Sequence, residues 1–288
     1  MRLGLLRAVG VIAAGVAITH ESQDQASGPK TGLLCTLANH KVDESSGVAA
    51  SRRRAGLYWT HNDSGDGPNF YAFDRKGRDL GTFTLKGVRA IDWEGMASAR
   101  IAGRPYLYFG DIGDNAERRK SVLVYRVPEP RARPGMHQID GFRTFTLRYP
   151  DGAHDCETLM VTPQGDIQLV TKSEYGASGI YRMLRPEKSG TYRLVKLGEM
   201  KVDASNVYSH MITGGDINAA GNRVIIRTYF TAMAFRTGNL DRWFRSKPVD
   251  VDIAFERQGE AICFDGSAAG LITTSERSPC RASFARLP

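Results

Sequence analysis

Acidic residues recur along this chain at the start of short apolar segments. Glu44, Glu94, Glu157 and Glu260 each lead such a segment, and successive members are 50, 63 and 103 residues apart. A second apolar segment follows each of them after a turn and ends in polar residues. Carboxylate oxygens are the hard ligands that Ca²⁺ and Mg²⁺ prefer. If the fold brings these acids together, the pattern predicts a metal centre assembled from distant parts of the chain.

The polar ends of the second segments supply further candidates for the same site. With the acids that precede them, the converging groups are Glu44, His61, Asn62 and Asp63; Asp92, Glu94, Asp111, Asp114 and Asn115; Asp155, Glu157, Lys172 and Glu174; Thr213, Arg227 and Tyr229; and Glu260, Glu276 and Arg277. So many carboxylates repel one another unless cations compensate them. Lys172 and Arg227 are the internal cations available, and a bound metal is the external one.

A repeat of about 50 residues built from short strands is typical of a β-propeller. The interval of 103 residues spans two repeats, with Thr213 in place of the missing acid. We therefore expect an all-β fold with a single propeller of five four-stranded blades. Strands of a blade run antiparallel outward from the centre. The start of each inner strand then lies beside the end of the second strand, which gathers the polar groups in one central funnel.

The last blade is expected to be completed by the other end of the chain. Three of its strands lie near the C-terminus, the last over Arg281–Leu287, and the fourth would be Gly32–Ala38. Such closure removes the open sheet edges of a linear array. A six-bladed ring is the alternative if Glu129–Gln138 or Met200–Tyr208 hides a degenerate blade. In the third blade, Gly179–Leu184 and Tyr192–Leu197 are expected to form the two outer strands.

The N-terminus has the features of an export signal. Arg2 and Arg7 precede the apolar stretch Ala8–Ile18, which is too short to span a bilayer comfortably. We expect a signal peptide over 1–25, a flexible leader over 26–30 and the propeller over 31–288, with the protein secreted or periplasmic and not membrane-spanning. A buried first strand is the alternative interpretation. Export would permit a disulfide, and Cys35 and Cys280 are the expected pair.

Composition indicates a soluble globular chain of 288 residues with a net charge of +8. Basic residues such as Arg52–Arg54 are scattered and are not interleaved with aromatic residues on one face, so nucleic acid is not an expected partner. A small anionic molecule or a surface glycan is the expected partner of a monomer. In a binding role, the contact surface would come from the aromatic residues Tyr58, Trp59, Trp93, Tyr108 and Tyr229.

Each candidate residue can be given an expected role. The candidate metal ligands are Glu44, Asn62, Asp63, Glu94, Glu157 and Glu260, with Ca²⁺ as the expected divalent metal. The candidate catalytic bases are Asp111 and Glu174. The candidate ligand-binding groups are His61, Asp114, Asn115, Lys172, Arg227, Glu276 and Arg277. Two structural alternatives stay open: the recurring Glu residues could tie blades together, and the loops around Asn62 and Asp114 could be ordinary Asx-Gly turns.

Two families of propeller share features with these residues. Glu44, Leu57–Trp59 and Phe70–Asp74 resemble the opening blade of gluconolactonase-type lactonases, which implies a metal role for Glu44. The Glu-Gly and Glu-Ala blade starts and Ser275–Glu276 resemble exported bacterial propellers of the phytase-like and esterase-like type. That resemblance implies a metal together with Lys172, Arg227 and Arg277 acting on a phosphate ester. The expected function is metal-dependent hydrolysis of phosphate esters or lactones, with a non-catalytic module that binds a glycan, peptide or surface polymer as the alternative.

Overall fold

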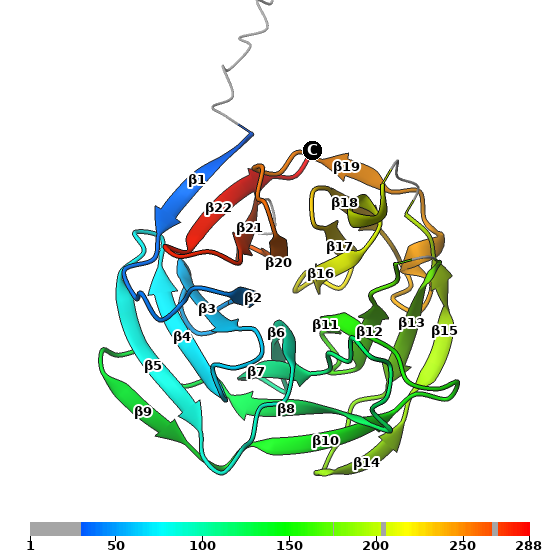
Figure 1. The fold of residues 1–288 in the computed structure, drawn as a ribbon, viewed down its shortest axis with the longest axis horizontal. Helices are drawn as coiled ribbons and strands as arrows, with labels where there is room; N and C mark the ends of the chain where they lie inside the picture. The colour runs from blue at the N-terminus through cyan, green and yellow to red at the C-terminus, as the bar shows by residue number, and fades with distance from the viewer. Residues whose placement is uncertain (1–29, 175, 203–205, 267–269) are drawn as a thin grey trace, which may run out of the picture.

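A computed structural model describes residues 30–174, 176–202, 206–266 and 270–288. Five β-sheets stand around a common centre, each running from an inner strand to outer strands at the rim (Figure 1). The predicted five-bladed propeller is therefore confirmed, and the six-bladed alternative is wrong. The predicted signal peptide over 1–25 lies outside the described residues. Within the described part of the chain, no helix is both long and apolar enough to span a membrane.

The first two blades have five strands each. The first contains β2 (Ser45–Ala50), β3 (Leu57–Asn62), β4 (Asn69–Asp74), β5 (Asp79–Leu85) and β9 (Met136–Ile139). The second contains β6 (Trp93–Ile101), β7 (Arg104–Asp111), β8 (Val122–Pro128), β10 (Arg143–Arg148) and β14 (Gly190–Arg193). Each fifth strand is parallel to its neighbour and comes from the blade that follows in the sequence. It therefore ties consecutive blades together at the rim.

The other three blades have four strands each. The third contains β11 (Cys156–Val161), β12 (Ile167–Thr171), β13 (Ser178–Met183) and β15 (Val195–Met200). The fourth contains β16 (Ile212–Ile217), β17 (Arg223–Thr228), β18 (Ala232–Arg236) and β19 (Val249–Val251). The fifth contains β20 (Gly259–Phe264), β21 (Gly270–Ser275), β22 (Arg281–Arg286) and β1 (Thr31–Thr36). Two short 3₁₀ helices, η1 (Val207–Ser209) and η2 (Trp243–Arg245), lie in connections of the third and fourth blades.

The ring closes as the sequence predicts. Strand β1 pairs antiparallel with β22, from Thr31 opposite Ala285 to Thr36 opposite Arg281. The N-terminal strand is thus the outermost strand of the C-terminal blade. Because strands from both ends of the chain share this sheet, it is complete only when the two ends have met.

Two predicted segments have different roles from those expected. Glu129–Gln138 hides no blade; its end belongs to β9, which adds to the first blade beside β5. Tyr192–Leu197 is not one strand, because the chain there leaves β14 in the second blade and enters β15 in the third. Periodicity alone could not separate these strands, since both are short and half-exposed at the rim.

Cys35 and Cys280 do not form the expected disulfide. Both are free, as are Cys156 and Cys263, and all four are buried. Burial raises the pKa of Cys35 to about 11 and that of Cys280 to about 12. They pack with Val42, Val48 and other residues in an apolar cluster between the first and last blades.

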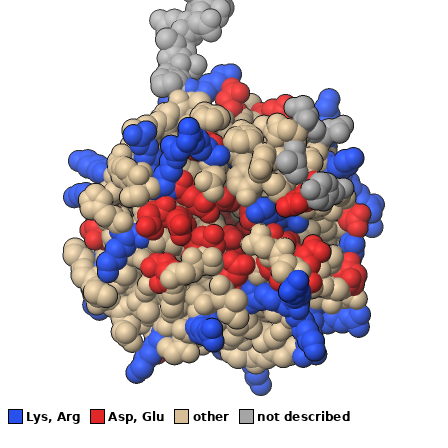
Figure 2. Space-filling view, in the orientation of Figure 1, with Lys and Arg blue, Asp and Glu red and all other residues tan. Residues whose placement is uncertain are grey.

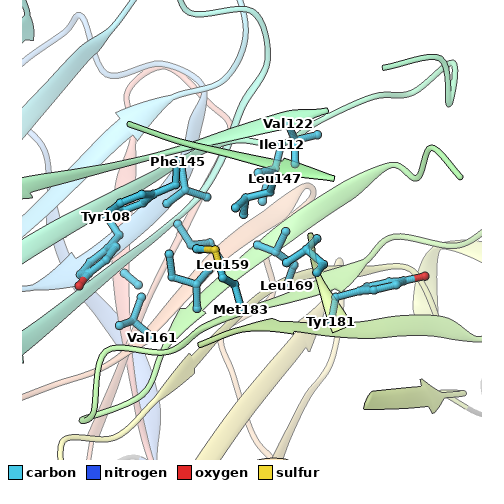
Figure 3. Close-up of a cluster of buried hydrophobic side chains, with 14 of the residues drawn as sticks. Tyr108, Ile112, Val122, Phe145, Leu147, Leu159, Val161, Leu169, Tyr181 and Met183 are labelled. Carbon is cyan, nitrogen blue, oxygen red and sulfur yellow. The ribbon is translucent and has the colours of Figure 1, made fainter. Parts of the chain in front are cut away.

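Apolar clusters fill the gaps between neighbouring blades. In one of them, Tyr108, Phe145 and Leu147 of the second blade meet Leu159 and Leu169 of the third, and all five are buried (Figure 3). Facing sheets bury their apolar side chains against each other, as in a sandwich. The ring is thus held by the same kind of contact five times over, which leaves the centre free for polar residues.

The inner strands approach one another closely at the axis, so small residues are required there. A Cβ on Gly47 would lie 2.2 Å from Nε2 of His61 and 2.8 Å from Cβ of Met96. A Cβ on Gly214 would lie 2.5 Å from the carbonyl oxygen of Glu260. The axial cavity between these strands is only about 10 Å³. The inner strands therefore close the centre at this level.

We expect Gly47→Ala to lower the free energy of unfolding by about 1–3 kcal/mol, because the added methyl group must displace buried neighbours. Urea unfolding followed by fluorescence measures this change. Gly238→Ala is the matched control, since no atom lies within 4 Å of a Cβ placed there. Equal midpoints for the two variants would contradict the close packing at the axis.

Candidate functional site

Every inner strand carries a β-bulge where it starts. In β2 the pairing with the next strand skips one residue, between Ser45 and Gly47. A similar shift occurs at the start of β6, where two residues are skipped, and of β11, β16 and β20, where one is skipped. The skipped positions are Ser46, Glu94 with Gly95, Glu157, Thr213 and Glu260. Bulges re-aim side chains and occur often beside functional sites. Here one polar residue from each blade is left out of the ladder at the centre.

This register corrects the predicted repeat in the first blade. Ser46, and not Glu44, occupies the position of Glu94, Glu157 and Glu260. Glu44 precedes the strand, is exposed, and forms an isolated bridge with Glu276 of the last blade. Ser46 instead donates its hydroxyl to the carboxylate of Glu94. The expected metal role of Glu44 therefore has no support from its position in the blade.

Seven carboxylates surround the bulges, and we call them the acidic funnel: Asp63, Asp92, Glu94, Asp155, Glu157, Glu260 and Glu276. Their charges act on one another across blades; for example, Glu94 responds to Glu157, Asp63 and Glu260. Acidic residues gather at the middle of this face, while Lys and Arg lie mainly toward its rim (Figure 2). A protein with a net charge of +8 thus has an acidic centre.

Three of these acids have the geometry of a cation site. Ligand oxygens of Asp63, Asp92 and Glu94 all lie within 4.8 Å of one another. Asp63 and Asp92 are half-buried and Glu94 is buried. This spacing suits one ion bound by three carboxylates from two blades, because carboxylate ligands lie 2.3–2.6 Å from Ca²⁺.

The loop after β7 holds Asp92 in place. The carboxylate of Asp111 accepts hydrogen bonds from the backbone N–H of Ile91 (3.1 Å) and of Asp92 (3.2 Å). Asp111 is fully buried and pairs with Arg119 at 2.8 Å. A Cβ on Gly113 would lie 2.5 Å from the carboxylate of Asp92, so glycine is needed beside it. Asp111, expected as a catalytic base, thus lies in a position that orients Asp92.

The floor of the funnel is formed by buried glutamates whose charge is poorly compensated. Glu157 and Glu260 are 5% and 4% exposed, and the Oε2 atom of each has no hydrogen-bond partner among the described residues. Burial, followed by the neighbouring carboxylates, raises the pKa of Glu94 and Glu157 well above the usual range. Burial and then the charge of Glu276 raise the pKa of Glu260 to about 7. Unpartnered buried carboxylates of this kind require a proton or a cation.

The wall of the funnel above the floor is also acidic. Burial, with the charges of Asp63 and Asp155, raises the pKa of Asp92 to about 6. Burial, with the charges of Asp63 and Glu44, raises the pKa of Glu276. The Asp155 carboxylate accepts the backbone N–H of Asp114 at 2.9 Å, which fixes the two loops against each other.

Lys172 is the cation placed inside this group of acids. Its ammonium pairs with Glu157 and lies 5.4 Å from the centre of the Tyr229 ring. Burial lowers the pKa of Lys172, but the negative charge of Glu157 outweighs that effect and raises the pKa. Lys172 therefore stays charged and neutralises one carboxylate.

The structure places several other predicted site residues outside the open funnel. His61 is fully buried, where its Nδ1 contacts the carbonyl oxygen of Asn62 at 2.8 Å, and burial lowers its pKa. The amide of Asn62 donates to the carbonyl oxygen of Lys41 at 2.6 Å. Arg227 is fully buried and pairs with Glu256 at 2.9 Å. These contacts are structural ones within and between blades.

The remaining predicted residues differ in exposure. Asn115, Glu174 and Arg277 are exposed, and Asp114 is buried with its carboxylate accepting the backbone N–H of Arg119 at 2.6 Å. The aromatic residues expected to form a binding surface are largely core, because Tyr58, Trp59, Trp93 and Tyr108 are buried.

Three residues of the site, Asp92, Asp155 and Ser46, were not assigned a role from the sequence. Asp92 was expected only to converge on the centre, yet it is one of the three acids in the cation geometry. Ser46 had no signal of its own. The spacing could have found Asp92, because Asp92–Trp93–Glu94 and Asp155–Cys156–Glu157 place an acid two residues before the bulge glutamates of the second and third blades.

The comparisons with known proteins give information about the fold alone. No protein-family model matches this sequence, and no curated protein is similar to it in sequence. A solved structure, the PQQ-bound form of aldose sugar dehydrogenase (Adh) from Streptomyces coelicolor, is similar with a TM-score of 0.51 at 9% sequence identity. The match covers 88% of this chain and 97% of that chain. At this identity, the similarity establishes a shared propeller architecture.

Proposed function

We propose that this protein is an exported hydrolase whose acidic funnel binds one divalent cation, with Ca²⁺ as the expected metal, and acts on neutral esters or lactones. The observation that carries the proposal is the group of Asp63, Asp92 and Glu94, with ligand oxygens within 4.8 Å of one another. The buried carboxylate of Glu260, whose Oε2 atom has no hydrogen-bond partner among the described residues, supplies an independent demand for positive charge.

The chemistry of the ligands favours a hard cation. All three candidate ligands offer carboxylate oxygen, and the nearby imidazole of His61 is buried against backbone carbonyls. Oxygen-only sites suit Ca²⁺ or Mg²⁺, and flexible carboxylates on two blades fit the irregular coordination of Ca²⁺ better than a strict octahedron. The missing ligands of such an ion would be water and substrate.

A bound cation of this type polarises a carbonyl oxygen as a Lewis acid. Among the protein groups, Glu260 is best placed to move the proton, because it is buried, its pKa is about 7 and Oε2 has no hydrogen-bond partner within the described residues. The oxygen of water bonds to the carbonyl carbon, and its proton passes to Glu260. The bond to the leaving oxygen then breaks, and that oxygen receives the proton from Glu260.

A neutral substrate fits the funnel better than a phosphate ester. Of the three cations expected to contact phosphate, Lys172 pairs with Glu157 and Arg227 pairs with Glu256, which leaves the exposed Arg277. A phosphate dianion would meet the remaining carboxylates at short range and be repelled. An ester or lactone carries no charge to repel.

Calcium should stabilise the metal-free protein. After dialysis against EDTA, we expect added Ca²⁺ to raise the melting temperature, because a ligand that binds only the native state stabilises it in proportion to ln(1 + [L]/Kd). Isothermal titration calorimetry should give one site per chain. Asp63→Asn keeps the side-chain shape and removes one charged ligand, so we expect at least a roughly tenfold weaker affinity. Asp140→Asn, an exposed aspartate away from the funnel, is the control.

Hydrolysis is tested with p-nitrophenyl butyrate, δ-valerolactone and p-nitrophenyl phosphate. We expect Ca²⁺-dependent turnover of an ester or the lactone, and Glu260→Gln should lower that turnover at Ca²⁺ concentrations that saturate the site. Calcium binding without turnover of any substrate would favour the non-catalytic binding module. No binding of Ca²⁺, Mg²⁺ or Mn²⁺ would refute the proposed metal site.

A further inference from the structure

A row of aromatic rings leads from the acidic funnel to the surface of the fourth blade. Tyr229, which lies over the Lys172 ammonium, is 6.1 Å from the ring of Tyr208 and 6.4 Å from that of Phe230. Phe230 in turn lies 6.3 Å from Phe255, with the two rings nearly parallel at 4°. Large aromatic residues at the surface usually pack inward, so a continuous exposed row indicates a binding surface.

The exposure of this row increases away from the funnel. Phe230, Tyr208 and Phe255 are 38%, 56% and 82% exposed. They come from the turn after β17 and from the connections that precede β16 and β20. Because β17 ends and β16 and β20 begin at the funnel side of the ring, all three rings lie on the same face as the acidic funnel.

A cavity of about 450 Å³ lies beside the row. Phe230 forms part of its wall, and its polar lining includes Ser209, Thr231, Asp250 and Asp252. Cavities of this size hold small ligands, and a few polar groups among apolar walls fix the ligand's orientation. The lining combines one aromatic ring, that of Phe230, with hydroxyl groups and carboxylate acceptors.

We propose that the aromatic row and this cavity bind a neutral sugar ring. The apolar face of a pyranose presents polarised C–H bonds, which pack against the negative face of an aromatic ring. Its hydroxyl groups can donate to the carboxylates of Asp250 and Asp252, and such charge-assisted hydrogen bonds are strong. The same two carboxylates, together with the acidic funnel, would repel an anionic sugar. The ligand class is therefore a neutral glycan.

The position of the row makes this site the substrate-recognition part of the proposed hydrolase. Tyr229 contacts Lys172 on one side and Phe230 on the other, so a ligand on the row would extend into the funnel. The substrate would then be an ester or lactone borne by a neutral sugar, an assignment that rests on the proposed function. Sugar binding itself does not require the metal.

The test is isothermal titration calorimetry in EDTA with neutral and anionic hexasaccharides. The neutral probes are the hexamers of cellulose, laminarin, xylan, mannan and chitin, and the anionic probes are hexagalacturonate and a heparin hexasaccharide. We expect at least one neutral probe to bind. Phe230→Ala and Phe255→Ala should each weaken that binding roughly tenfold, since truncated aromatic anchors lose much of the binding energy.

Matched variants separate this site from the funnel. Leu184→Ala removes an apolar side chain that is 64% exposed elsewhere on the surface and should leave binding unchanged. Because the titration is run in EDTA, it measures sugar binding without the proposed metal, so its outcome does not depend on that of the Ca²⁺ titration. Phe255 is mostly exposed, so its replacement should not alter the melting temperature. The inference is overturned if no neutral probe binds, if only anionic probes bind, or if both Phe variants bind like the wild type.

Discussion

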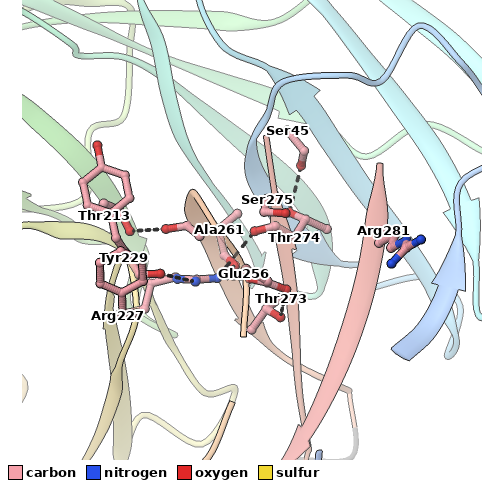
Figure 4. A network of polar contacts seen from close by, with 12 residues as sticks. Ser45, Thr213, Arg227, Tyr229, Glu256, Ala261, Thr273, Thr274, Ser275 and Arg281 are labelled. Carbon is pink, nitrogen blue, oxygen red and sulfur yellow. Dashed lines mark hydrogen bonds and ion pairs between the residues drawn. The ribbon is translucent and has the colours of Figure 1, made fainter. Parts of the chain in front are cut away.

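Arg227→Met should lower the free energy of unfolding by about 3–5 kcal/mol, because it leaves a buried carboxylate without its charged partner. Arg227 is fully buried, and its guanidinium extends from the fourth blade into the fifth (Figure 4). There it donates to Glu256 at 2.9 Å and to the carbonyl oxygen of Ala261 at 3.0 Å. Glu256 also accepts the hydroxyl of Thr273 at 2.7 Å.

The loss of stability in Arg227→Met comes from the carboxylate of Glu256, which stays buried without its partner. A double-mutant cycle can show this. Glu256→Gln should be destabilising alone, yet the double variant Arg227→Met/Glu256→Gln should recover part of the loss, because no buried charge is then unpaired. Arg185→Met breaks an exposed pair with Glu187 and should change stability by less than about 1 kcal/mol. Urea unfolding midpoints measure all four variants. A loss no larger than that of Arg185→Met would refute the role of Arg227 as a tie between blades.

The architecture could be predicted because the repeat has a simple physical basis. Each blade buries its apolar faces against its neighbours, so the strand–turn–strand pattern recurs and is visible in the sequence. Closure by β1 was also predictable, since the last blade had only three strands of its own. The strands β9 and β14 were not, because each belongs in sequence to one blade and in space to another. That exchange depends on the length and path of surface loops, which carry no periodic signal.

The site was predicted less well than the fold, and the β-bulges explain why. A one-residue shift of register changes which side chain faces the centre. Glu44 has the residue type of the recurring acid, but the bulge of β2 makes Ser46 the equivalent residue. Burial was the second obstacle. Arg227 and Lys172 look alike in sequence as cations at strand ends, yet one is fully buried between blades and the other pairs within the acidic funnel.

Glu260→Gln should make the metal-free protein about 2–3 kcal/mol more stable than the wild type at pH 8, and leave its stability at pH 4 nearly unchanged. The pKa of Glu260 is about 7 in the native state, against an ordinary value of 4.5, because of burial and the charge of Glu276. A raised pKa means that the native state binds the proton more tightly than the unfolded state. The stabilisation that comes from this bound proton is therefore full below pH 4.5 and is lost as the pH rises through about 7. One pKa unit corresponds to about 1.4 kcal/mol, so the full loss is about 3 kcal/mol.

Calcium should weaken this dependence, which links the prediction to the acidic funnel. In EDTA, the melting temperature of the wild type should fall between pH 5 and pH 8, since the pKa of Asp92, Glu94 and Glu157 is raised as well. With Ca²⁺ present, the fall in melting temperature should be smaller, because at high pH the cation takes the place of the protons that the acids lose. At low pH the cation competes poorly with protons for the carboxylates, so its effect there should be small. Glu187→Gln, an exposed glutamate, is the control and should follow the wild type. The prediction fails if, in EDTA, the melting temperature of Glu260→Gln depends on pH as that of the wild type does. Glu260 would then ionise in the native state at no cost, and the carboxylates of the acidic funnel would need no cation.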